Sequence, residues 1–124
     1  MNQRPFYLNL LRIRLPVGGL VSILHRASGA LLSLAIPALL YAFMLSLRSA
    51  EDFRRVGEFF GGFFGWLLAV VLTWALLHHF LAGLRHLGFD IGLGEAKAAA
   101  RLSARLCLLA AILITALIWL GARS

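Results

Sequence analysis

Residues 27–47 read ASGALLSLAIPALLYAFMLSL, an apolar stretch without a single charged side chain. It lies between Arg26 and Arg48, and the 22 residues from one arginine to the other span about 33 Å of α-helix. That length matches the hydrocarbon core of a bilayer, and arginines at both ends are typical membrane-interface residues. Pro37 leaves the carbonyl of Ser33 without its helical donor, which predicts a kink in the middle of this helix.

Two more apolar stretches follow, over residues 59–84 and 106–122. The first is about 40 Å long as a helix, so we expect it to tilt or to enter the interface. The segment SAEDFRRVGE at 49–58 is predicted to be a short polar loop. The chain is therefore predicted to be an all-α membrane protein, one membrane-anchor domain over 1–124, with transmembrane helices near 19–47, 59–84 and 104–122.

The composition supports the same class. Of the 124 residues, 61% are hydrophobic, and the mean hydropathy is +0.89, more apolar surface than a soluble domain of this size can bury. The net charge of +7 does not indicate nucleic-acid binding, because the basic residues punctuate apolar runs as juxtamembrane anchors do. Cys107 is the single cysteine, which excludes an intrachain disulfide and covalent haem attachment through CxxCH.

The distribution of Lys and Arg predicts the orientation. Eight of these residues fall on the N-terminal side of the membrane and four on the other, the latter being Arg48, Arg54, Arg55 and Arg123. Because cytoplasmic loops carry the excess of positive charge, we expect the N-terminus in the cytoplasm and the C-terminus in the periplasm.

Polar residues interrupt the beginning of the first apolar run. Ser22, His25 and Arg26 are spaced i, i+3 and i+4, so they share one helix face near the cytoplasmic boundary. A hydroxyl and a guanidinium fork suit a quinone carbonyl or a carboxylate. The alternative is that Arg26 is a snorkelling anchor and His25 an interface residue.

Two adjacent histidines, His78 and His79, lie within the second apolar run. Ionisable residues inside a membrane are costly and by default suggest function. Helical geometry puts His79, Gly83 and His86 on one stripe, where the glycine allows a large flat ligand to approach the backbone. Neutral imidazole is a common axial ligand of haem iron. The alternative is that the pair only forms hydrogen bonds to neighbouring helices.

At these residues the chain resembles the cytochrome b subunit, the larger membrane anchor, of succinate dehydrogenase. The resemblance covers nearly the whole chain and rests on distinctive segments: Arg4-Pro5, Ile13-Arg14-Leu15-Pro16, Ser22-Ile-Leu-His25-Arg26-Ala-Ser28-Gly29, His79, Gly83-Leu-Arg85-His86 and Asp90. It implies that the subunit is not catalytic by itself but belongs to a succinate:quinone oxidoreductase complex of electron transport and the tricarboxylic acid cycle.

The resemblance also implies residue roles. His79 corresponds to the haem iron ligand, and Ser22 and Arg26 to the ubiquinone-binding residues. His25 and Arg26 lie where the haem propionates are met, and Asp90 corresponds to an acidic residue of proton delivery to the quinone.

The implied cofactor is haem b, shared with a second small membrane-anchor subunit, and the implied substrate is ubiquinone. The other implied partners are an iron–sulfur subunit and a flavoprotein subunit, in a bacterial inner membrane rather than a mitochondrial one. Two alternatives stand beside this interpretation: the anchor of a fumarate reductase, and a non-redox membrane scaffold or proton-pathway subunit that uses the same His and Arg residues.

Overall fold

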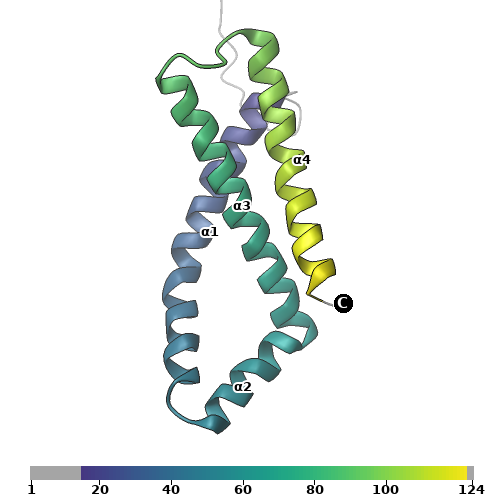
Figure 1. The fold of residues 1–124 in the computed structure, drawn as a ribbon. Helices are drawn as coiled ribbons and strands as arrows, with labels where there is room; N and C mark the ends of the chain where they lie inside the picture. The colour runs from purple at the N-terminus through teal and green to yellow at the C-terminus, as the bar shows by residue number, and fades with distance from the viewer. Residues whose placement is uncertain (1–14, 123–124) are drawn as a thin grey trace, which may run out of the picture.

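The computed structural model describes residues 15–122, and these residues form helices joined by short connections (Figure 1). In chain order the helices are α1 (Val17–Ser46), α2 (Ala50–Gly61), α3 (Phe63–Asp90) and α4 (Lys97–Gly121). The sequence motifs at Arg4-Pro5 and at Ile13-Arg14, and the basic residue Arg123, lie outside the described residues.

Helices α1, α3 and α4 are each long and apolar enough to cross a membrane. They contain 30, 28 and 25 residues, and their most apolar windows have mean hydropathies of 1.9, 1.9 and 2.2. The prediction of an all-α protein with three transmembrane helices is therefore confirmed. Helix α1 continues through Pro37 without a break in its helical assignment.

Helix α2 corrects the prediction of a polar loop at 49–58. Ser49 caps this helix, because its hydroxyl accepts a hydrogen bond from the backbone N–H of Asp52 at 3.0 Å. Arg55 pairs with Glu51 one turn earlier on the exposed face. Apolar residues such as Phe53 lie between these charged residues in the sequence, so the segment is an amphipathic helix. Its charged residues were the reason for predicting a loop.

A sharp bend at Gly62 separates α2 from α3, and it explains why the second long helix begins at Phe63 rather than near residue 59. Gly62 is extended, with φ −74° and ψ 164°. A Cβ at Gly65 would lie 2.0 Å from the carbonyl oxygen of Phe59, so only glycine allows the two helices to approach so closely there.

The three long helices pack through small side chains. Figure 1 shows α1 crossing α3 near the end where α1 begins, with α4 beside both helices at that end. At this crossing Val21, Ala82, Ala104 and Cys107 form a buried cluster. Small residues let transmembrane helices come into close contact. Towards its other end α1 diverges from α3, and α2 bridges the two helices (Figure 1).

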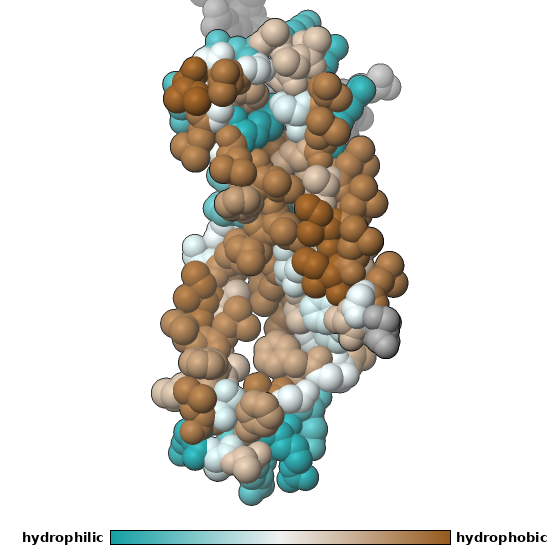
Figure 2. All heavy atoms as spheres, in the orientation of Figure 1, coloured by the Kyte–Doolittle hydropathy of each residue, from teal (hydrophilic) through white to brown (hydrophobic). Residues whose placement is uncertain are grey.

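The exterior is apolar over the middle of the molecule and polar at its two ends. Figure 2 shows a broad hydrophobic belt between hydrophilic caps. Large apolar side chains stay exposed within the belt, for example Leu34 at 77% and Leu117 at 69%. This is the surface that lipid or another membrane subunit covers.

Candidate functional site

Three histidines converge at the end of the bundle where α1 begins and α3 ends. The ring of His25 on α1 stacks on the ring of His79 on α3, with centroids 4.2 Å apart and planes inclined by 11°. His86, two turns further along α3, lies 5.2 Å from His25 with its ring tilted by 50°. These ring contacts make the three histidines one cluster. All three side chains are half-buried, which places the cluster at the edge of the packed core.

Hydrogen bonds fix which nitrogen of His79 carries a proton. Its Nδ1 lies 3.0 Å from the backbone oxygen of His25, which can only accept a hydrogen bond, so Nδ1 is the donor. The hydroxyl of Ser28 donates to the same carbonyl at 3.0 Å and lies 3.4 Å from Nδ1. In neutral His79 the lone pair is then on Nε2, which is the usual state of a metal-binding imidazole held by a backbone carbonyl.

Gly29 of α1 lies against the ring of His79, a contact between helices that the stripe of His79, Gly83 and His86 along α3 did not predict. A Cβ at Gly29 would lie 2.8 Å from Cε1 of His79, closer than real side chains approach. Gly83 instead faces His25, whose Nε2 would be 3.5 Å from a Cβ there. The stripe of His79, Gly83 and His86 follows from the spacing along α3 alone. The crossing of α1 over α3 decides which histidine each glycine contacts.

Ser22 and Arg26 lie on the same face of α1, as predicted from their spacing. The Nη2 of Arg26 donates to the hydroxyl of Ser22 at 3.3 Å. Arg26 is exposed and Ser22 is half-buried. A permanent positive charge and a hydroxyl group are thus held together at the membrane edge, with Arg26 next to His25 in the chain and Ser22 three residues before it.

Arg85 has a structural role that the sequence did not reveal. Its Nε donates to Ser103 at 3.1 Å and its Nη2 to the carbonyl of Ala100 at 3.1 Å, both on α4. Its guanidinium also lies 4.4 Å from the centroid of the Phe89 ring. In the sequence Arg85 directly follows the apolar run 59–84, and the one polar signal of a partner is Ser103, shortly before the apolar run 106–122.

His78 is separate from the histidine cluster. It is completely buried and stacks on Trp74, with centroids 5.3 Å apart. Neither ring nitrogen has a hydrogen bond of standard geometry within residues 15–122. The backbone of Val21 is close enough to interact with the ring. Because the chain's own helices enclose His78, there is no space beside its ring for a planar ligand.

Asp90 is exposed at the last position of α3, one turn after His86. No salt bridge involves it within the described part of the chain. Asp90 lies at the same end of the bundle as the histidine cluster, and no hydrogen bond or ion pair joins them among residues 15–122.

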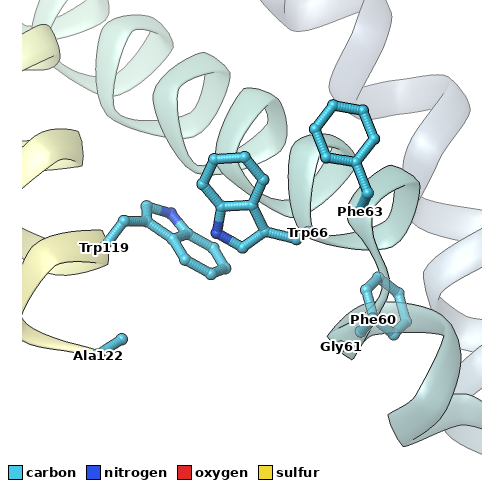
Figure 3. A pocket seen from close by; sticks show the side chains of 6 residues that line it. All are labelled: Phe60, Gly61, Phe63, Trp66, Trp119 and Ala122. Carbon is cyan, nitrogen blue, oxygen red and sulfur yellow. The ribbon is translucent and has the colours of Figure 1, made fainter. Parts of the chain in front are cut away.

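A cavity of about 600 Å³ lies at the other end, between the α2–α3 bend and the end of α4. Figure 3 shows Trp66 and Trp119 side by side there, with ring centroids 6.3 Å apart. Tryptophans gather at membrane–water interfaces. This cavity marks the second membrane boundary and is remote from the histidines.

The chain is similar in sequence to known membrane subunits over most of its length. The family model described as succinate dehydrogenase/fumarate reductase transmembrane subunit matches residues 1–118. The succinate dehydrogenase cytochrome b556 subunit of Coxiella burnetii is 36% identical over 104 residues, 82% of each chain. The subunit of the same name from Paracoccus denitrificans is 32% identical, over 73% of this chain and 70% of its own. That of Rickettsia felis is 29% identical over 95% of this chain and 92% of its own.

Proposed function

Since this chain belongs to the family of succinate dehydrogenase/fumarate reductase transmembrane subunits, we propose that it binds a b-type haem through His79 and contributes to a ubiquinone-reduction site. Its curated relatives are cytochrome b subunits of succinate dehydrogenase, and the chain is a multi-pass inner-membrane subunit that is not catalytic by itself. Such a subunit works in a complex with a flavoprotein and an iron–sulfur subunit. The proposal concerns which residues of this chain hold the cofactor and the quinone.

The observation that carries the proposal is the hydrogen bond from Nδ1 of His79 to the carbonyl of His25, 3.0 Å long. It leaves the lone pair on Nε2, where it can bind iron, and the ring is half-buried at the edge of the core. His78, the neighbouring candidate, is fully enclosed. A bound haem b supplies an iron that takes up and returns single electrons.

We propose a second ligand from another membrane subunit. Imidazole binds iron through a nitrogen lone pair that lies in the plane of the ring. The rings of His25 and His79 are stacked face to face, so their nitrogens do not converge on one point between them. This favours a haem shared between two chains over one ligated by His25 and His79 together.

His25 and Arg26 suit the haem propionates, because a guanidinium and an imidazole N–H both donate to carboxylates. Ser22 and Arg26 suit the quinone, because the hydroxyl and the guanidinium already form one hydrogen-bonded pair, 3.3 Å apart. Both donors favour the negative charge that develops on a quinone oxygen during reduction. Asp90, exposed at the same end, is proposed to pass protons towards that oxygen.

Fumarate reductase is the second candidate, since the matching family includes its transmembrane subunits. The two functions share the site and differ in the direction of electron flow. Purified complex is the material for the test: dithionite reduction should give the absorption bands of a low-spin b-type haem, and succinate should reduce ubiquinone. A colourless complex would contradict the proposal and favour a non-redox scaffold. A complex that reduces fumarate with a low-potential quinol much faster than it oxidises succinate would favour fumarate reductase.

A further inference from the structure

Ser28 and Gly29 of α1 lie against the ring of His79, and neither belongs to the proposed quinone or propionate groups. Ser28 is 2% exposed, unusually buried for a hydroxyl residue near the end of a bundle. Its hydroxyl donates to the His25 carbonyl, as serines in helices commonly do towards the preceding turn. What is particular here is the second neighbour of that hydroxyl, Nδ1 of His79, at 3.4 Å.

The two contacts around Nδ1 have a single consistent direction. Because the Ser28 proton points to the His25 carbonyl, the Ser28 oxygen faces His79 with a lone pair. The carbonyl of His25 likewise offers only a lone pair. Both neighbours therefore require a proton on Nδ1, and together they select one tautomer of the ring.

Gly29 supplies the space for this arrangement. It follows His25 by four residues, so a side chain at position 29 would stand one helical turn above the His25 carbonyl. An added Cβ would be 2.8 Å from Cε1 and 3.2 Å from Nδ1 of His79. The ring or α1 must shift to relieve that overlap, and such a shift disturbs the hydrogen bond between Nδ1 and the His25 carbonyl.

We propose that Ser28 and Gly29 are positioning residues that hold His79 in its Nδ1–H tautomer and keep Nε2 as the iron-binding nitrogen. This inference rests on the proposed function, since it assumes that His79 is the ligand. Partners of this kind orient metal-binding histidines, and losing them typically weakens metal affinity by about 10- to 100-fold. Neither residue needs to touch the haem.

The test uses the whole purified complex and two matched pairs of variants. Gly29→Ala is paired with Gly88→Ala, because a Cβ at Gly88 meets nothing within 4 Å. Ser28→Ala is paired with Ser46→Ala, because Ser46 makes the same hydroxyl-to-carbonyl bond at the other end of α1, to Phe43 at 2.7 Å. The measurements are the low-spin haem signal in electron paramagnetic resonance and the rate of haem loss to excess apomyoglobin. Co-elution of the partner subunits checks assembly.

Gly29→Ala should shift the low-spin g values and speed haem loss at least ten-fold, and Ser28→Ala should do the same to a smaller extent. Gly88→Ala and Ser46→Ala should match the unmodified complex. If Gly29→Ala and Ser28→Ala also match it, the positioning proposal is wrong. His79→Tyr separates this outcome from failure of the proposed function: a low-spin signal that survives His79→Tyr overturns the ligand assignment itself.

Discussion

His25 and His79 are 54 residues apart in the chain, yet their rings are stacked 4.2 Å apart, and the backbone of one accepts a hydrogen bond from the other. This contact joins the polar residues near the start of α1 to the histidine-bearing part of α3. Ser22 and Arg26, the proposed quinone-binding pair, lie on the same stretch of α1. A substitution that displaces His25 should therefore affect both proposed functions, whereas one at Ser22 should affect the quinone alone.

The haem ligand can be identified by replacing each histidine in the assembled complex. His79→Tyr should abolish the low-spin haem signal, because Nε2 of His79 is the proposed ligand. His78→Phe should retain the signal, because His78 is buried against Trp74 and away from the cluster. Optical and electron paramagnetic resonance spectra measure the outcome. Loss of the signal in His78→Phe with normal assembly, and its retention in His79→Tyr, would move the ligand by one residue.

Ser22→Ala should raise the KM for ubiquinone about ten-fold and leave the haem spectrum unchanged. Loss of one hydrogen bond to a polar partner costs about 1–3 kcal/mol. Arg26→Leu should be more severe, because it removes a positive charge and several donors at once. Steady-state succinate:quinone reductase assays measure both. Normal kinetics in the two variants would leave Arg26 as an interface anchor only.

Asp90→Asn should slow quinone reduction without changing haem content, because the amide cannot carry a proton to the reduced quinone. Glu95→Gln is the control, since Glu95 is also exposed but lies in the connection after α3 rather than one turn from His86. A solvent deuterium isotope effect that increases only in Asp90→Asn would support proton delivery. Equal rates in both variants would exclude it.

Arg85→Leu should lower the melting temperature of the detergent-solubilised complex, because it removes the two hydrogen bonds that the Arg85 side chain donates to α4. Hydrogen bonds from charged groups contribute about 1.5–3 kcal/mol each. Ser103→Ala should have a smaller effect of the same sign. Arg101→Leu is the matched control, an exposed arginine on α4 whose loss should change stability little. Equal melting temperatures for Arg85→Leu and Arg101→Leu would contradict the structural role.

Reporter fusions test the orientation. A reporter after Ser124 should be active in the periplasm, and one inserted near Gly94 should be active in the cytoplasm. The connection containing Gly94 joins α3 to α4 at the end that carries Lys97, Arg101 and Arg105. The opposite pattern would put the histidine cluster on the periplasmic side, away from the soluble subunits.

The sequence by itself determined the three transmembrane helices and singled out the ionisable side chains within them as candidates for the chemistry. Apolar runs as long as the bilayer is thick have no stable place in water, and ionisable side chains within them are too costly to be incidental. Spacing along one helix also predicted the contact between Ser22 and Arg26. The transmembrane helices and the shared face of Ser22 and Arg26 depend on hydrophobicity and local periodicity, and both can be read from the sequence.

Only the tertiary structure decided how α1 and α3 meet. The assignment of Gly29 to His79 and of Gly83 to His25, the carbonyl that holds Nδ1, and the enclosure of His78 all depend on the crossing of two helices. Side-chain packing between helices sets that crossing, and no periodicity within one helix encodes it. Helix α2 was missed for a different reason: its Ser49 cap and its i, i+4 ion pairs are local signals, and the polar composition of the segment hid them.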